Sequence, residues 1–194
     1  MTYRAIPAIA AAAALFGAGA AQAEAEKYVL DSSHSQVVFS YNHLGFSTTT
    51  NMFSGFEGEI MFDQEDPASS SVSVAMPVMS LFTGWEKRFE HFMSDDFFGA
   101  EEGDMVTFES TGIEVTGDDT AVITGDLTMN GVTRSVDLDA ELNKAAQHPM
   151  AGKPWAGFDA TTTLLRSDYG LDKFAPAISD EVQVEISIEA MKAE

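Results

Sequence analysis

DSSHSQVVFSYNHLGFSTTTNMFSGFEGEIMFD, residues 31–63, contains two runs typical of β-strands, joined by a polar connection. Apolar side chains recur at every second position on both sides of a Ser/Thr-rich connection: Val37, Phe39 and Tyr41, then Phe56, Ile60 and Phe62. Alternation with a period of two is the pattern of a β-strand with one wet face. A two-stranded ribbon is marginal alone, so the rest of the chain must supply further strands that cover its apolar face.

Further strands are predicted over most of the chain. The same alternation recurs at 69–75, 106–115, 121–128, 132–142, 158–165 and 182–188, and Asn130-Gly131 is a strong hairpin-turn signal. The count is about eight strands of ordinary length, joined as consecutive antiparallel neighbours. This predicts an all-β fold, either a sandwich or a closed barrel, and closure would remove exposed edges. An eight-stranded barrel holds a dry core or one small ligand, and the pattern does not separate the two.

In one segment the spacing of the apolar residues changes from that of a strand to that of a helix. Trp85, Phe89 and Phe92 are spaced i, i+4 and i+7 with charged residues between them, which predicts a short amphipathic helix. Phe97 and Phe98 follow as a second aromatic group. The sequence therefore predicts one helix packed against the sheet by aromatic side chains.

The first 23 residues are typical of a cleaved signal peptide. Arg4 is followed by an apolar run and by Ala21-Gln22-Ala23, a small-x-small cleavage site. We therefore expect residues 1–23 to be removed and residues 24–194 to form a single, soluble domain.

Charge and cysteine content exclude several classes of partner. The chain has 10 Lys and Arg against 31 Asp and Glu, a net charge of −21, and loss of Arg4 with the leader gives 9 − 31 = −22. Such an acidic surface argues against nucleic acid and anionic membranes as partners. The chain has 0 Cys, so disulfides, thiol nucleophiles and thiolate metal sites are excluded.

Six segments in order resemble the YceI-like family of exported lipid-binding proteins. They are Asp31-x-x-His34-Ser35 with His43-x-Gly45, Phe53-x-x-Phe56-x-Gly58, Arg88-x-x-His91-Phe92-x-Ser94-x-Asp96-Phe97-Phe98, Thr107-Phe108-x-Ser110, Gly125-Asp126-Leu127-Thr128-x-x-Gly131, and Arg166-Ser167-Asp168-Tyr169-Gly170. Phe89 and Phe92 depart from the family pattern, which has Asp and Leu there.

The resemblance implies a lipocalin-like antiparallel barrel of eight strands, with the helix near its mouth and a long apolar pocket inside. It also implies a periplasmic protein, or less often a secreted one, that binds a polyisoprenoid or another lipid-like chain, including a quinone or a fatty-acid-like molecule. A membrane cytochrome is an implied partner, the protein would be a monomer or a homodimer, and no cofactor is required.

The predicted pocket is lined by apolar side chains from the strands and closed by aromatic residues of the helix. The strand residues are Phe39, Tyr41, Phe53, Phe56, Met76, Phe108, Leu127 and Met129, and the helix residues are Trp85, Phe89 and Phe92. The competing interpretation is an ordinary packed core beneath a helix. Methionine would let such a pocket adapt to chains of different length.

Polar candidates are few. A polar ligand head could contact His43, Arg88, Arg134 or Arg166, and an anionic head would need such cations in so acidic a protein. The histidines show no HxH or HxxxH spacing, so we predict no metal site. His34 and His43 are instead expected to tie turns by hydrogen bonds, and His91 to tether the helix.

No catalytic residues are predicted. The chain lacks the GxSxG, Walker, HExxH and Gly-rich dinucleotide patterns. Carboxylate pairs such as Asp95-Asp96 are expected by chance in so acidic a chain. The sequence thus favours a binding protein, with a lipid-directed hydrolase or isomerase, or a soluble partner of a membrane redox complex, as alternatives.

Overall fold

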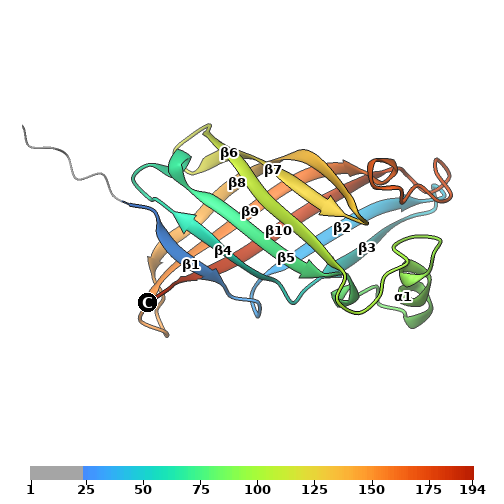
Figure 1. Cartoon of the computed structure of the whole chain (residues 1–194), viewed down its shortest axis with the longest axis horizontal. Helices are drawn as coiled ribbons and strands as arrows, with labels where there is room; N and C mark the ends of the chain where they lie inside the picture. Colours follow the sequence, from blue (N-terminus) through green and yellow to red (C-terminus); the bar gives the residue numbers. More distant parts are fainter. Residues whose placement is uncertain (1–23) are drawn as a thin grey trace, which may run out of the picture.

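Ten β-strands form one antiparallel sheet in a computed structural model that describes residues 24–194 (Figure 1). The strand order is β1-β4-β5-β6-β7-β8-β9-β10-β2-β3, and β1 also pairs with β10, which closes the sheet into a barrel. The predicted signal peptide lies outside the described residues. Within 24–194, no helix has the length and apolar character needed to cross a membrane.

The strands are β1 (Glu26–Leu30), β2 (Gln36–His43), β3 (Ser47–Phe53), β4 (Glu57–Phe62), β5 (Ser71–Pro77), β6 (Met105–Val115), β7 (Thr120–Met129), β8 (Val132–Gln147), β9 (Pro154–Leu165) and β10 (Glu181–Lys192). The α-helix is α1 (Glu86–Met93), and the short 3-10 helices are η1 (Pro67–Ser69), η2 (Val78–Ser80) and η3 (Arg166–Tyr169).

The ten strands amount to eight barrel positions, which confirms the predicted eight-stranded barrel. β1 and β2 both pair with the same edge of β10, Tyr28 opposite Lys192 and Val37 opposite Ile186, so they are two halves of one kinked strand. β4 pairs with β1 and β3 pairs with β2, so β3 and β4 are likewise halves of the next strand. The predicted ribbon is wrong in its pairing: the Ser/Thr-rich segment expected to be a connection is strand β3, which pairs with β2, whereas the second apolar run, β4, pairs with β1.

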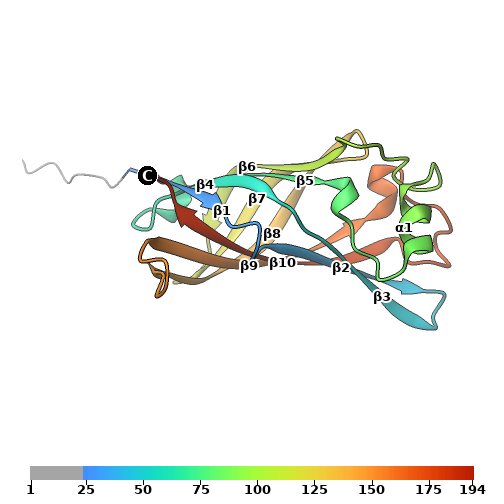
Figure 2. The same ribbon diagram turned by 90° about the horizontal axis from the view of Figure 1, so that it is seen from below.

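The break between the two halves of each kinked strand has a local cause. At the first, the Asp31 carboxylate accepts hydrogen bonds from the backbone and hydroxyl of Ser33, which turns the chain out of the strand. At the second, Gly55 has φ +71°, a conformation that favours glycine, and Ser54 donates its N–H to the Ser80 hydroxyl. Beyond the breaks, β2 and β3 run on toward α1 (Figure 2).

Helix α1 confirms the predicted short helix. Gly84 has φ +73° and redirects the chain before the helix, and Ser94 ends it by donating its N–H to the His91 carbonyl. Figure 1 shows α1 at one end of the barrel, beside the loops that follow β5 and β9. The helix therefore sits where the resemblance places a mouth.

Strand boundaries differ from prediction where the chain is locally polar. β8 continues to Gln147 and β9 begins at Pro154, beyond the predicted strands 132–142 and 158–165, and the pairing continues past an irregularity between Leu142 and Lys144. Sequence analysis also missed β1, which precedes the quoted stretch and is held between β4 and β10.

Apolar side chains pack together at the β1 end of the barrel. Tyr28, Ile60 and Phe62 are buried there, and the rings of Tyr28 and Phe62 meet edge to face with centroids 5.8 Å apart. Ala156 and Ala190 are buried against the same cluster. These two alanines are paired across β9 and β10.

Candidate functional site

A cavity of about 300 Å³ lies inside the barrel. Its lining runs from Phe97 and Phe98, after α1, to Asp118 and Asp119 in the β6–β7 turn at the other end of the barrel (Figure 1). Most of the lining is apolar because each strand turns its alternate Val, Ile, Leu and Phe side chains inward. The volume falls at the lower end of the range for small-molecule sites.

Most of the predicted pocket residues meet at this cavity. The residues that line it are Phe39, Phe53, Phe56, Met76, Phe92, Phe108, Leu127 and Met129. The structure thus brings together side chains from β2, β3, β5, β6, β7 and α1. Their role toward a ligand remains a prediction.

Three predicted residues lie elsewhere. Tyr41 is next to Phe92, with ring centroids 6.4 Å apart, and Phe89 packs against the buried core. Trp85 is 60% exposed and stands at the N-cap, before the first turn of α1. The helical spacing predicted that Trp85 and Phe92 share one face of the helix. However, α1 begins at Glu86, so Trp85 is not on that face.

Aromatic side chains close the α1 end of the cavity. Phe92 stacks on Phe97 with centroids 5.3 Å apart, and it approaches Phe39 at 6.4 Å. Phe98 meets Phe53 edge to face at 6.4 Å. The two aromatic groups noted in the sequence therefore form one cover over the strands β2 and β3.

A row of alanines was missed by sequence analysis. Ala121, Ala140 and Ala160 are opposite one another on β7, β8 and β9, and all three line the cavity. Small side chains at matched register positions leave space where larger ones would meet. The alternation of each strand was visible in the sequence, but the register that aligns the alanines was not.

The four predicted head-group residues do not form a cluster. Arg166 is the one that lines the cavity, whereas His43, Arg88 and Arg134 lie outside the lining. Arg88 donates to the Thr83 carbonyl at 2.9 Å, and Arg134 is exposed. The cations that could hold an anionic head are thus dispersed.

The Arg166 guanidinium is occupied by its own loop. It donates to the carbonyls of Ser179 at 2.9 Å and Ile178 at 3.0 Å, and also to those of Leu171 and Lys173. Burial lowers the pKa of Arg166, while the nearby Asp180 and Asp172 oppose that shift. Arg166 therefore fastens the 171–180 loop over the end of β9, and its stem faces the cavity.

Polar side chains in the lining gather at the opposite end. Ser70, Thr120 and Glu141 join Asp118 and Asp119 around the β6–β7 turn. This end carries negative charge and no lining cation, so it disfavours an anionic group.

Asn51 brings a buried amide to the inner face of β3. It is 2% exposed, shares the inward face with Phe53, and pairs with Phe39 on β2. Among residues 24–194 its side-chain nitrogen and oxygen have no hydrogen-bond partner. A buried amide without a partner is costly. Asn51 is not itself among the residues that line the cavity, but it lies beside Phe39 and Phe53, which are, so it is a candidate to bind a neutral polar group.

The histidines behave as expected where contacts are observed. His34 Nδ1 lies 2.7 Å from Asp31 Oδ2 within the turn, and His91 Nε2 lies 3.3 Å from Asp96 Oδ2 after the helix. The hydrogen bond to His34 lowers the pKa of Asp31 and raises the pKa of His34. The first contact holds a turn and the second ties the helix to the segment that follows it, as predicted.

A closed eight-stranded β-barrel with an apolar cavity is an architecture that can enclose one apolar small molecule. The chain belongs to the YceI-like family, since the YceI-like domain matches residues 28–190. This confirms the resemblance seen in the sequence.

Relatives cover the chain almost completely. A "UPF0312 protein" of Ectopseudomonas mendocina (strain ymp) is 37% identical over 194 residues, spanning 99% of this chain and 100% of the relative. A protein of the same name from Pseudomonas putida (strain F1) is 36% identical over 192 residues, with 99% of each chain covered.

Solved structures share the fold. The Campylobacter jejuni YCEI protein is 28% identical, with a TM-score of 0.70 over 79% of this chain and 90% of that one. Burkholderia cenocepacia BcnA has a TM-score of 0.74 at 22% identity, covering 82% and 98% of the two chains. A polyisoprenoid binding domain from Saccharophagus degradans has a TM-score of 0.68 at 16% identity, covering 86% and 98%.

Proposed function

We propose that this protein is an exported, periplasmic carrier that binds an isoprenoid or similar lipid-like chain inside the barrel, without covalent chemistry. The observation that carries the proposal is the apolar cavity of about 300 Å³, closed by Phe92, Phe97 and Phe98. The name of the Saccharophagus degradans domain, which shares the fold, supports the same class of ligand.

Burial of a hydrocarbon chain provides the free energy. Each methylene transferred from water contributes about 0.8 kcal/mol, so roughly ten carbons offset a binding cost on the order of 8 kcal/mol. Hydrophobic burial is not directional, so such a site selects ligands by the length and width of their hydrocarbon chains. This fits a cavity lined by several strands and by Met76 and Met129, whose flexible side chains adapt to different chains.

The polar groups favour a neutral head. Arg166 is committed to loop carbonyls, and the β6–β7 end of the cavity is acidic. Asn51 offers a buried amide near Phe39 and Phe53. We therefore propose an alcohol, amide or quinone head in preference to a phosphate or carboxylate, with a prenylated quinone as the redox-linked candidate.

Native mass spectrometry tests the proposal. Protein exported to the periplasm and purified without detergent should carry an apolar molecule that organic solvent extracts. The stripped protein should then bind farnesol and a short-tailed prenyl quinone, and farnesyl phosphate more weakly. If no molecule is extracted and neither neutral probe binds, the carrier function is wrong.

A further inference from the structure

A second cluster of polar side chains lies on the outside of the barrel, at the kink between β1 and β2. Here Asp31 donates its N–H to the Glu189 carbonyl at 2.8 Å, and Glu189 donates its N–H to the Ser35 hydroxyl at 3.3 Å. Both ends of the turn are thus fixed to one residue of β10. As a result, Asp31, His34 and Glu189 lie together although β10 is distant in the sequence.

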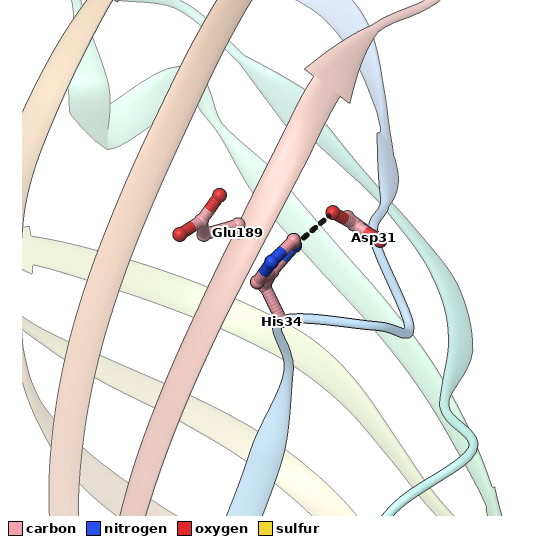
Figure 3. A group of neighbouring side chains, drawn as sticks. All are labelled: Asp31, His34 and Glu189. Carbon is pink, nitrogen blue, oxygen red and sulfur yellow. Dashed lines mark hydrogen bonds and ion pairs between the residues drawn. The ribbon is translucent and has the colours of Figure 1, made fainter.

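The three side chains have the geometry of an open metal site. Each offers a ligand atom, and these atoms all lie within 4.8 Å of one another. Figure 3 shows the His34 ring between the carboxylates of Asp31 and Glu189. In tetrahedral zinc sites the bonds are about 2.0–2.2 Å, which puts ligand atoms roughly 3.4 Å apart. The His34 side chain is 65% exposed, so it can make this adjustment.

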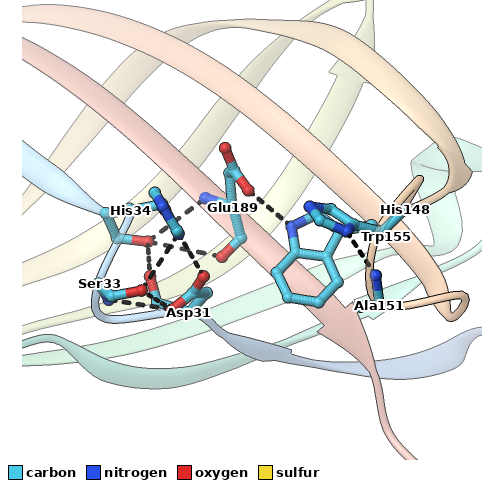
Figure 4. Close-up of polar contacts among 8 residues, drawn as sticks. Asp31, Ser33, His34, His148, Ala151, Trp155 and Glu189 are labelled. Atoms are coloured by element: carbon cyan, nitrogen blue, oxygen red, sulfur yellow. Dashed lines mark hydrogen bonds and ion pairs between the residues drawn. The ribbon is translucent and has the colours of Figure 1, made fainter.

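Neighbouring groups orient both carboxylates. Asp31 Oδ1 accepts the Ser33 N–H at 3.0 Å and the Ser33 hydroxyl at 2.7 Å, which leaves Oδ2 toward His34. Glu189 Oε2 accepts the indole N–H of Trp155 at 2.8 Å, which leaves its other oxygen available (Figure 4). Supporting hydrogen bonds of this kind hold ligands in place before an ion binds.

Trp155 is itself held by the loop between β8 and β9. Its ring packs on His148 with centroids 4.7 Å apart, and His148 Nδ1 accepts the Ala151 N–H at 3.0 Å (Figure 4). His148 thus uses Nδ1 for the loop and supports the site through Trp155.

We propose that Asp31, His34 and Glu189 bind one Zn²⁺ ion, with water completing the coordination. One imidazole and two carboxylates suit zinc, whereas Ca²⁺ and Mg²⁺ prefer oxygen alone. The ion would join the kink of the first strand to β10, where β10 changes partner from β1 to β2. Its role is to strengthen this seam of the barrel, on the opposite side of the wall from the cavity.

Calorimetry with ZnCl₂ on the chelator-treated full chain tests the site. We expect saturable binding of one ion and a rise in Tm with zinc but not with Mg²⁺. His34→Ala and Glu189→Gln should each weaken the affinity at least about tenfold. His91→Ala is the matched control, since His91 also contacts an aspartate, Asp96, and should leave the affinity unchanged.

Glu189→Gln keeps an oxygen that can accept from Trp155, so it tests the ligand without removing the support. The inference is wrong if the wild-type protein shows no saturable zinc binding. It is also wrong if binding persists unchanged in both Glu189→Gln and His34→Ala, or if His91→Ala abolishes it.

Discussion

Replacing Ala140 by Phe should block the cavity while leaving the barrel folded. Ala140 is the middle residue of the alanine row, between Ala121 and Ala160, and faces the space that a ligand would occupy. A phenyl ring there projects into a void and displaces no packed side chain. We therefore expect a change in stability near the lower end of the roughly 1–3 kcal/mol that overpacking costs in filled cores.

The loss of binding affinity depends on how much of the ligand's hydrocarbon chain the phenyl ring at position 140 would exclude from the cavity. A prenyl unit has five carbons, so excluding one unit removes about 4 kcal/mol of burial at about 0.8 kcal/mol per carbon. At about 1.4 kcal/mol for each factor of ten, this sets a ceiling near 1000-fold in Kd. The chain can bend and recover part of the contact, so we expect a loss of at least tenfold.

The assay is calorimetric titration of the stripped protein with farnesol. The Tm of each variant is measured in parallel. Ala146→Phe is the matched control, because Ala146 lies on the same strand but is exposed. Equal affinities for farnesol in the Ala140→Phe and Ala146→Phe proteins, both folded, would refute the cavity as the binding site.

Three further changes test other parts of the structure. Asn51→Leu should stabilise the stripped protein by about 1–3 kcal/mol in urea unfolding, because it removes a buried amide without a partner, and should weaken binding of farnesol more than of a plain hydrocarbon; a less stable variant would show that the amide is satisfied. Gly58→Ala should unfold the protein or lower its Tm strongly, because a β-carbon there would overlap the Ser73 carbonyl of β5, and an unchanged Tm would contradict the β4–β5 pairing. The Asp180 carboxylate accepts hydrogen bonds from the Ser167 N–H and hydroxyl, and these hydrogen bonds lower the pKa of Asp180. The stability that ionised Asp180 contributes is therefore complete at neutral pH and is lost as the pH falls below about 4. The Tm difference between wild type and Asp180→Asn should therefore shrink from pH 7 to pH 3, and a difference that persists at pH 3 would contradict this cause.

Much of the local structure could be predicted from the sequence alone. Alternation with a period of two marked most strands, Asn130-Gly131 marked a hairpin, and the spacing of Phe89 and Phe92 marked the helix, because each depends on residues close together in the chain. The family motifs then pointed to the barrel, and eight of the predicted pocket residues line its cavity.

Features that depend on strand register and on pairing between distant segments could not be predicted from the sequence. The alignment of Ala121 with Ala140 and Ala160 leaves space inside the barrel, and no single strand encodes it. The hydrogen bonds from Arg166 to carbonyls of the 171–180 loop, and the approach of Glu189 on β10 to His34, join segments that are far apart in the sequence or held by a loop. These contacts form only when the sheet closes. Pairing of β1 and β2 with β10 joins the two ends of the chain, so no single segment determines it.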